Sequence, residues 1–372
     1  MVHLYQDPDV TYARKHGAVV RLNSWTLHLP PTFGFCGGVL NAIRLLQKVT
    51  EEKPDNRIWL LGDIIHNETV NTYFRELGVH ILPEHRIGEI FACVDRSDIV
   101  VIPAFGIPKN LDTKLRETFP AGHIVDTTCR YVKRIWDFVR EMVDEGRTVV
   151  IHGKPQHPET QATLSRSLTA NNAVILVPDI PTAGKVAEAV RTGTAGGLPE
   201  ALIRNPAHLR LDRLALVNQT TMLFSETKRI EAIIDAAAQE TGADFRSSET
   251  VCEATQDRQD AALKLCRTSC DLLLVIGGYS SSNTNQLYRL ASQHAPTFFI
   301  NNADAIERDR IRHYLPEKKH EVTTQQWLAP DIRDIGVLAG ASCPASDIGD
   351  VIRKFRRFCA GVGDAGESSQ TS

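Results

Sequence analysis

Three cysteines stand out in the sequence because each directly precedes a helix-forming segment. They are Cys36 in FGFCGGVLNAIRLL, Cys129 in VDTTCRYVKRIWDF and Cys252 in ETVCEATQDRQDAA. Free backbone N–H groups and the dipole at a helix start favour the thiolate, the form of cysteine that binds metal. One such cysteine usually packs as a small hydrophobic residue. Three in equivalent places, too widely spaced for a zinc finger or a ferredoxin, predict metal ligands that the fold brings together.

Three thiolates can hold three corners of a 4Fe-4S cluster, which leaves the fourth iron free to bind a substrate oxygen. The chain has eight cysteines, too few and too irregular for a disulfide scaffold, so we expect thiols in a reducing compartment. We interpret the other cysteines as packing or surface residues, with Cys266 and Cys270 on one helix and Cys93 opening a strand. The role of Cys343 is left open, because this residue adjoins Ser342 in a predicted site loop.

Each of the three cysteines opens one round of a weak threefold repeat. A helix-forming segment is followed by an apolar run that ends in a polar loop, at His66, His157 and Ser281. These residues lie 30, 28 and 29 positions after their cysteines. A second apolar run ends in another short loop, which reaches Phe105, Gln219 and Ser342. Such agreement over three rounds indicates three related structural units.

The polar loops carry side chains suited to proton transfer and phosphate binding. In HPET, His157 and Glu159 can transfer protons beside a reducing centre, although a His-Pro-Glu sequence alone is an ordinary surface turn. His66 has the same two interpretations. The polar run at 281–284 opens a helix, so it can cradle a phosphate, cap the helix, or do both. Thr220 offers a hydroxyl to the same centre.

Short β-branched runs alternate with longer amphipathic segments almost throughout, which indicates α/β units with parallel sheets. Ligands of open α/β sheets bind beyond the carboxyl ends of the strands. Three similar units around a pseudo-threefold axis would bring three cysteines and six polar loops to one point. Such an arrangement would suit a metal cluster with a substrate beside it.

The predicted division of the chain follows the cysteines. It gives an N-terminal extension (1–26), three α/β units (27–128, 129–249 and 250–358), an insertion near 190–213 within the second unit, and a disordered tail (359–372). The insertion is inferred from its glycines and prolines, and the tail from its small polar residues.

Composition narrows the function classes further. The formal net charge is −3, with 42 basic against 45 acidic residues, so we expect no nucleic-acid partner and no attraction to an anionic membrane. No apolar run approaches the roughly 18 residues that cross a bilayer. The first residues lack the order of a secretion signal and the composition of a transit peptide. The sequence therefore predicts a cytoplasmic protein.

With these motifs in order, the chain resembles the LytB family of 4-hydroxy-3-methylbut-2-enyl diphosphate reductases from about Leu27 to Lys354. The matching signatures are GFCGGV, IIHNETV, DTTC, HGKPQHPETQAT, NQTTMLFSET, CEATQDRQDA, GGYSSSNTNQL and AGAS. PAFG, NQTTML and the ATQDRQDA run look like the plant and cyanobacterial branch. Together these signatures are highly specific for the family.

The resemblance implies an iron–sulfur oxidoreductase with one 4Fe-4S cluster on Cys36, Cys129 and Cys252. The implied fold is a trefoil of three pseudo-threefold-related α/β units with small parallel sheets around that central iron–sulfur cluster. It implies reductive dehydroxylation of (E)-4-hydroxy-3-methylbut-2-enyl diphosphate to isopentenyl and dimethylallyl diphosphates, the last step of the methylerythritol phosphate pathway. Glu159 would donate protons through a network with Thr220, and ferredoxin or flavodoxin would supply electrons. The implied substrate-binding residues are His66, His157, Thr220, Ser281, Ser282, Asn283 and Ser342.

Three positions depart from the family pattern and motivate the first of two alternatives that stay open. Phe105 stands where the commoner bacterial branch has a histidine, Ser280 replaces an asparagine, and Cys343 replaces a small residue. One alternative is a paralogue with the same fold and cluster that acts on another allylic diphosphate. The other is a non-catalytic iron–sulfur sensor or binding protein, which an inert Glu159→Gln substitution would favour.

Overall fold

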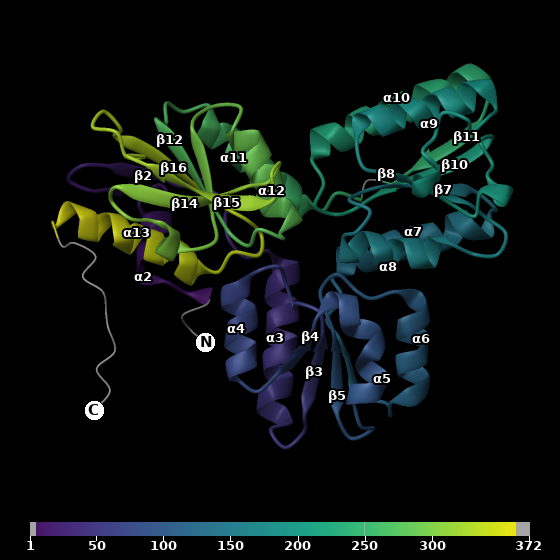
Figure 1. Cartoon of the computed structure of the whole chain (residues 1–372), viewed down its shortest axis with the longest axis horizontal. Coiled ribbons are helices and arrows are strands. Elements are labelled where there is room, and N and C mark those ends of the chain that lie inside the picture. Colours follow the sequence, from purple (N-terminus) through teal and green to yellow (C-terminus); the bar gives the residue numbers. More distant parts are fainter. Residues whose placement is uncertain (1–4, 249, 362–372) are drawn as a thin grey trace. The chain divides into compact units, whose positions relative to one another are not determined.

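The computed structural model describes residues 5–248 and 250–361, which form two compact units. The first unit contains residues 5–36, 66–70 and 257–361, and the second contains 37–65, 71–248 and 250–256. Figure 1 labels their helices and strands. In the described part of the chain, no helix combines the length and apolar character that crossing a bilayer requires.

The first sheet of the second unit has four parallel strands in the order β4-β3-β5-β6. Their bounds are His80–Leu82, Ile58–Leu61, Ile99–Ile102 and Ile124–Asp126. β5 is buried along its whole length, as expected of a central strand between helical layers. The accompanying helices are α3 (Gly37–Glu52), α4 (Glu68–Glu76, from residue 71 on), the 3-10 helix Glu84–Glu89, α5 (Ile90–Cys93) and α6 (Lys109–Thr118).

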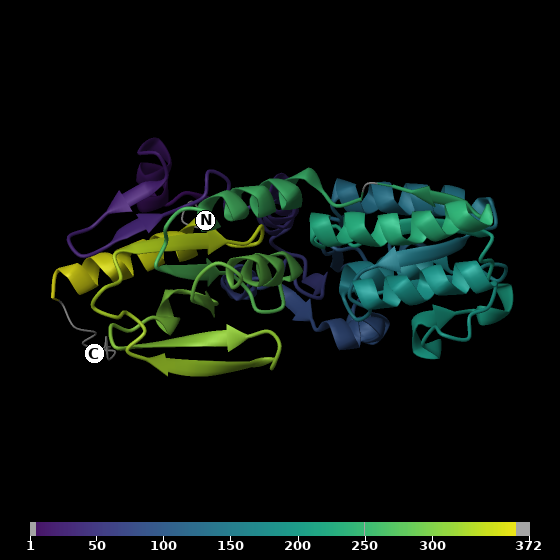
Figure 2. The same ribbon diagram turned by 90° about the horizontal axis from the view of Figure 1, so that it is seen from above.

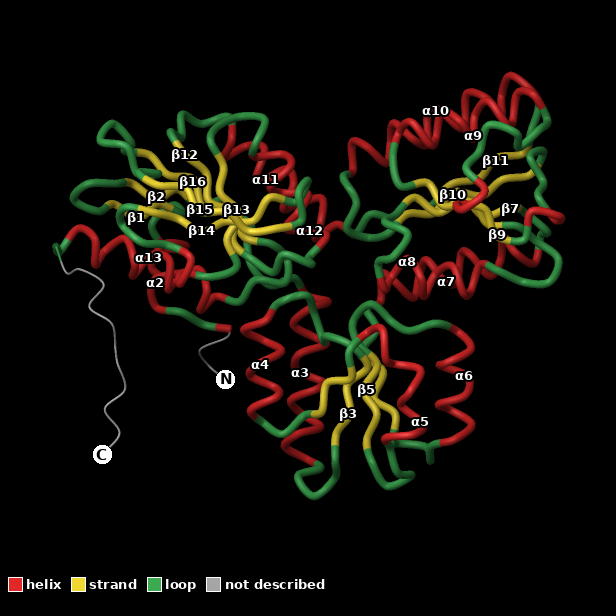
Figure 3. The backbone as a smooth tube through the Cα atoms, in the orientation of Figure 1, coloured by secondary structure: helices red, strands yellow, loops and turns green. Residues whose placement is uncertain are grey.

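The second sheet of this unit has the order β11-β10-β7-β8-β9, in which β9 alone of these strands runs antiparallel. The bounds are Asp244–Ser247, Arg213–Asn218, Thr148–His152, Val174–Val177 and Ile203–Arg204. Helices α9 (Ile180–Thr192) and α10 (Phe224–Thr241) cover one face, and α7 (Arg130–Asp144) and α8 (Pro158–Ser167) the other (Figure 3).

Side chains of β7 and β10 alternate between the two faces of this sheet. Val150 and Leu216 pack in the cluster with α9 and α10, whereas Val149 and Val217 pack in the cluster with α7 and α8. This alternation follows from the two-residue period of a strand. Both faces are apolar, which explains why these strands read as continuous apolar runs in the sequence.

The first unit has one five-stranded sheet in the order β1-β2-β16-β12-β13. Its strands are Val19–Arg21, Thr26–His28, Asp334–Ala339, Leu272–Ile276 and Thr297–Ile300. Its helices are α2 (Pro8–Lys15), α11 (Glu253–Cys266, from residue 257 on), α12 (Ser282–Ala291), the 3-10 helix Ala303–Ala305 and α13 (Ala345–Cys359). Strands β14 (Arg310–Leu315) and β15 (His320–Gln325) form a separate hairpin (Figure 2).

The three sheets repeat one strand order: β4-β3-β5-β6, β8-β7-β10-β11 and β13-β12-β16-β2. The last strand of each set shortly precedes Cys129, Cys252 or Cys36. β2 therefore completes the last sheet from the other end of the chain, pairing Thr26 with Asp334. The predicted class of three α/β units with small, mainly parallel sheets is confirmed.

Some local predictions were wrong. Cys93 ends α5 instead of opening a strand. α11 ends at Cys266, so Cys270 lies outside the helix. The Thr268 hydroxyl donates to the carbonyl of Leu265 at 2.6 Å and occupies an acceptor in the last helical turn.

The segment 190–213 contains more regular structure than an insertion loop. α9 continues to Thr192 and ends at Gly193, whose φ of 69° suits a helix end. Two 3-10 helices, Glu200–Leu202 and Pro206–His208, flank β9. The tail expected from 359 mostly lies outside the described residues, although α13 includes Cys359. The division at 27, 129 and 250 stays a prediction.

Candidate functional site

The three predicted cysteines occupy equivalent positions, each in front of a helix and beside a strand-end loop. Each backbone N–H donates to a carbonyl in the loop that follows β5, β10 or β16. The three hydrogen bonds are Cys129 to Ala104 at 3.0 Å, Cys252 to Thr220 at 3.4 Å and Cys36 to Ala341 at 3.2 Å. All three cysteines are half-buried. Each sheet thus holds one cysteine at the carboxyl end of its strands, where ligands of α/β proteins bind.

These positions fit a metal-binding thiolate, but the ligand set stays a prediction. Cys36 belongs to the first unit, whereas Cys129 and Cys252 belong to the second. Within residues 5–248 and 250–361, no group of three or more His, Cys, Asp or Glu side chains is arranged to hold a metal ion.

Other cysteines have surroundings that favour the neutral thiol. Burial raises the pKa of Cys266 to about 11 and the pKa of Cys343 well above its ordinary value. Burial also raises the pKa of Cys270. A neutral thiol is a poor metal ligand, so this chemistry agrees with packing roles for all three.

Glu159 and Thr220 form a buried acid–hydroxyl pair in the second unit. Glu159 lies in the first turn of α8 and is 2% exposed. One carboxyl oxygen accepts from the Thr220 backbone N–H at 2.6 Å, and the other accepts from the Thr220 hydroxyl at 2.8 Å. Burial raises the pKa of Glu159 to about 7, against the lowering effect of both hydrogen bonds. The carboxyl can therefore hold or release a proton near neutral pH.

His157 is oriented at the start of α8, where it is the N-cap residue. Its Nδ1 accepts the backbone N–H of Glu159 at 3.2 Å, which fixes the ring against the first turn of the helix. The edge-to-face ring contact with Phe105 has a centroid separation of 5.8 Å. The aromatic residue at 105 therefore packs against an implied substrate-binding histidine instead of offering a donor of its own.

Gln219 links two strand-end loops of this unit. Its Oε1 accepts from the Lys154 backbone N–H at 3.1 Å and from the Thr160 hydroxyl at 3.2 Å. Its Nε2 donates to the Thr221 hydroxyl at 2.6 Å. Gln219 therefore fixes the start of α8, which carries Glu159, to the loop that carries Thr220.

The implied phosphate-binding residues of the first unit form a buried polar cluster at the start of α12. Ser281 caps this helix and accepts the backbone N–H of Thr284 at 3.3 Å. The Ser342 hydroxyl lies 3.2 Å from the Ser281 hydroxyl and 3.3 Å from the carbonyl oxygen of His66. Asn283 Oδ1 accepts the Ala341 backbone N–H at 2.9 Å.

Two polar atoms of this cluster are suited to a polar ligand. Ser282 and Asn283 are 2% and 3% exposed. In the described part of the chain, no hydrogen-bond partner reaches Ser282 Oγ or Asn283 Nδ2. A buried donor without a partner is costly, so these atoms fit a site for phosphate oxygens at a helix start.

A glycine makes the close packing around His66 possible. A Cβ atom at Gly278 would lie 2.3 Å from the carbonyl oxygen of His66. Any larger residue would push the loop after β12 away from the 66–70 segment. The close approach of His66 therefore explains why the second glycine of VIGGYSSSNT, Gly278, has no side chain.

The predicted site residues fall into two sets, one in each unit. The first unit contains Cys36, His66, Ser281, Ser282, Asn283 and Ser342. The second unit contains Cys129, His157, Glu159, Thr220 and Cys252. The first set carries the polar groups suited to an anion, and the second carries the buried acid.

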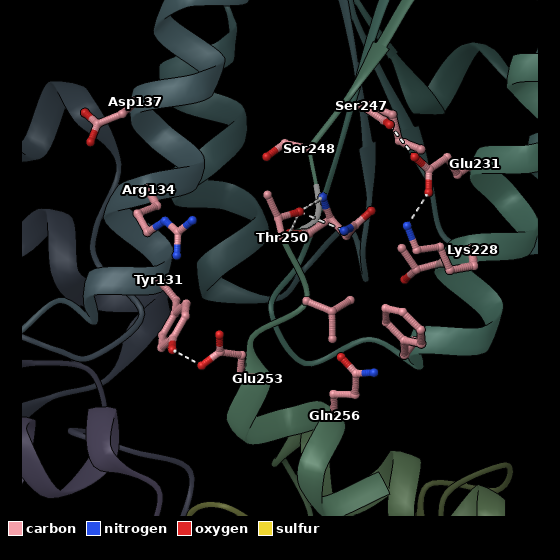
Figure 4. Close-up of a pocket in the computed structure, with 15 residues that line it drawn as sticks. Tyr131, Arg134, Asp137, Lys228, Glu231, Ser247, Ser248, Thr250, Glu253 and Gln256 are labelled. Carbon is pink, nitrogen blue, oxygen red and sulfur yellow. Dashed lines mark hydrogen bonds and ion pairs between the residues drawn. The ribbon is translucent and has the colours of Figure 1, made fainter. Parts of the chain in front are cut away.

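Sequence reasoning missed a cleft of about 470 Å³ in the second unit. Tyr131, Arg134, Lys228 and Glu253 are among its lining residues (Figure 4). The Tyr131 hydroxyl donates to Glu253 Oε2 at 3.1 Å and joins the starts of α7 and α11, the helices that follow Cys129 and Cys252. Nothing in the sequence pairs these two residues, because 122 positions separate them.

Sequence reasoning also missed Asn67 and Asp347. Asn67 stands before α4 and its Oδ1 accepts the Val70 backbone N–H at 3.0 Å. A helix-capping signal in HNET could have indicated that bond. Its other bond, from Nδ2 to Asp347 Oδ2 at 3.3 Å, spans 280 positions and leaves no sequence signal.

Comparison with known families and proteins gives concordant matches. The family described as LytB protein matches residues 28–356. A Synechococcus protein called 4-hydroxy-3-methylbut-2-enyl diphosphate reductase is 35% identical over 368 residues, which cover 94% of this chain and 90% of that protein. A Gloeobacter violaceus protein of the same name is 33% identical, covering 99% of this chain and 91% of the relative.

Two solved structures share the fold. A structure described as (E)-4-hydroxy-3-methyl-but-2-enyl diphosphate reductase, the terminal enzyme of the non-mevalonate pathway, has a TM-score of 0.55 and 25% identity, covering 89% of this chain and 99% of that one. The E-1-hydroxy-2-methyl-but-2-enyl-4-diphosphate reductase from Plasmodium falciparum has a TM-score of 0.67 and 20% identity, covering 89% and 88%. Both neighbours have the trefoil fold of three α/β units.

Proposed function

We propose a function from one premise: the chain belongs to the LytB protein family. It reduces (E)-4-hydroxy-3-methylbut-2-enyl diphosphate to isopentenyl and dimethylallyl diphosphates, the last step of a non-mevalonate isoprenoid pathway. Two electrons and two protons are consumed, the C–O bond of the allylic alcohol breaks, and the hydroxyl group leaves as water. The observation that carries this proposal is the buried Glu159–Thr220 pair, an acid poised near neutral pH in a chain of this family.

Enzymes of this family are iron–sulfur proteins. We assign one 4Fe-4S cluster to this chain, with Cys36, Cys129 and Cys252 as ligands. Their repeated position before a helix and beside a strand-end carbonyl supports the assignment. When bound, the cluster would supply electrons one at a time and an iron position open to the substrate hydroxyl.

Glu159 is the proposed proton donor and Thr220 its relay. The 2.8 Å bond between Glu159 and the Thr220 hydroxyl provides a direct path for a proton. The second bond, from the Thr220 backbone N–H, fixes the carboxyl group so that its other oxygen keeps facing the hydroxyl. The Thr220 carbonyl also accepts the backbone N–H of Cys252, so Thr220 contacts one of the proposed cluster ligands.

The diphosphate group is assigned to hydrogen-bond donors. We propose His66, His157, Thr220, Ser281, Ser282, Asn283 and Ser342 as the substrate-binding residues. The buried Ser282 hydroxyl and Asn283 amide support this assignment, because both are donors and Ser281 caps the helix beside them. A site of this kind holds an anion locally in a chain whose net charge is only −3.

We further propose that a ferredoxin or flavodoxin delivers the electrons and that the protein works in the cytoplasm. The family match over 28–356 and the site favour this account over the two alternatives. Phe105 is one reason to consider a paralogue that acts on another allylic diphosphate. Its ring nevertheless packs against His157, which keeps its place at the helix start.

One assay separates the proposal from both alternatives. The protein is reconstituted anaerobically with iron and sulfide, then given reduced methyl viologen and the hydroxymethylbutenyl diphosphate. The proposal predicts both isoprenoid diphosphates from the native chain and loss of at least a hundredfold in kcat for Glu159→Gln. Rapid turnover of a different allylic diphosphate alone would favour the paralogue, and equal activity of Glu159→Gln would remove the acid from the mechanism.

A further inference from the structure

A buried carboxyl group that the proposed reaction does not use holds the loop of His66. Asp347 lies in the first turn of α13 and is 3% exposed. Its Oδ2 accepts from Asn67 Nδ2 at 3.3 Å, and its Oδ1 accepts from the Thr69 hydroxyl at 3.1 Å. The two donors stand on either side of Glu68, directly after His66.

These bonds act on a short segment that belongs to the first unit, although the residues on either side of it in the sequence belong to the second. Residues 66–70 pack within the first unit, whereas the chain before and after them belongs to the second. Just outside the segment, Asn71 bonds to the backbone of Ile64 and Ile65 within the second unit. The bonds to Asp347 therefore act on the five residues that include His66.

The backbone of His66 is also held in the first unit. Its carbonyl oxygen accepts from the Ser342 hydroxyl at 3.3 Å. The absence of a side chain at Gly278 allows that same carbonyl to approach closely. Asp347 adds the side-chain contacts that fix the next three residues of the segment, so position 66 is defined relative to Ser281, Ser282 and Ser342.

Burying a carboxyl group at position 347 costs free energy, because the group loses its hydration. Its donors are an amide and a hydroxyl, which do not offset the loss of water around it, so burial raises the pKa of Asp347 to about 7. Apolar side chains of similar volume often replace buried charged groups without loss of stability. A role in directing the donors of Asn67 and Thr69 explains why an acid stands here.

We propose that Asp347 is a positioning residue for substrate binding: it holds the 66–70 segment so that His66 is available with Ser281, Ser282 and Ser342 for the diphosphate group. This inference rests on the proposed function, because it takes those residues as the diphosphate-binding set. It assigns Asp347 no contact with substrate.

The test compares Asp347→Ala and Thr69→Val with a control, Asp304→Asn, in the reconstituted holoprotein. Asp304 is an exposed carboxylate of the first unit, in the 3-10 helix Ala303–Ala305. We expect Asp347→Ala to raise the KM for the hydroxymethylbutenyl diphosphate and the Kd for inorganic diphosphate by about tenfold, the effect of losing a buried hydrogen-bond partner. We expect kcat and iron content to change less than about threefold, and amide exchange in 66–70 to accelerate.

Thr69→Val should produce a smaller change of the same kind, about threefold, and Asp304→Asn none. Unchanged KM and Kd in Asp347→Ala, or a fall in kcat with KM unchanged, would overturn the inference. If Asp347→Ala does not fold, Thr69→Val decides, and an unchanged Kd for diphosphate in that variant overturns it. Failure of the proposed function would look different: the native holoprotein would then not turn over the substrate at all.

Discussion

Replacing Glu159 with glutamine should stabilise the protein at alkaline pH while it abolishes activity. The amide keeps the size of the carboxyl group, and it can still accept the Thr220 backbone N–H and hydrogen-bond the Thr220 hydroxyl. What it removes is a buried ionisable group whose pKa burial raises from 4.5 to about 7. The variant therefore separates the energetic cost of the acid from its shape.

The sign and size of the effect follow from proton linkage. Below pH 4.5 the carboxyl is protonated in both folded and unfolded chains and costs nothing. Between 4.5 and 7 the unfolded chain loses the proton first, so the free energy of unfolding falls as pH rises. With a pKa of about 7 in the folded state, the stability lost between pH 5 and pH 8 is about 2.5 kcal/mol.

Anaerobic urea unfolding followed by tryptophan fluorescence can measure this difference. Glu159→Gln should gain about 2.5 kcal/mol relative to the native chain on going from pH 5 to pH 8, whereas the exposed-site control Glu188→Gln should gain nothing. An equal stability difference at both pH values would refute the reasoning, because it would mean that Glu159 is not a buried acid with a raised pKa.

Two further predictions concern the rate and the cluster. The turnover number should fall as pH rises above about 7, since Glu159 must be protonated to donate. Thr220→Val should lower kcat about tenfold and move this fall to higher pH, because the hydroxyl bond holds the pKa of Glu159 down and its loss lets the pKa rise; a pH profile identical to that of the native enzyme would exclude Thr220 from the relay. Cys252→Ser should lose the cluster's visible absorption and most of its iron, whereas Cys359→Ser should keep both, and iron retained in Cys252→Ser would remove that residue from the ligand set.

Local patterns predicted the parts of the fold that depend on neighbouring residues. The apolar runs became β3, β7 and β12, because burial on both faces leaves a clear signal in a parallel strand. The polar segments after them became strand-end loops and the first turns of the helices that follow. The equivalent positions of the three cysteines were visible in the same threefold repeat of helix-forming segments and apolar runs. Their common backbone bonds to strand-end carbonyls add a repeat that the residue types alone do not encode.

Long-range contacts account for what the sequence did not reveal. The pairing of Thr26 with Asp334 and the bond between Asn67 and Asp347 join residues far apart in the chain. A single sequence carries no local signal for such contacts. The raised pKa of Glu159 was equally hidden, since it arises from burial among side chains that the fold brings together.

The most direct test of the account is product formation by the anaerobically reconstituted protein with reduced methyl viologen as electron source. The account predicts that hydroxymethylbutenyl diphosphate is converted to isopentenyl and dimethylallyl diphosphates by protein that contains about four irons per chain, the content of one 4Fe-4S cluster. Protein with a full complement of iron that forms neither product would contradict it.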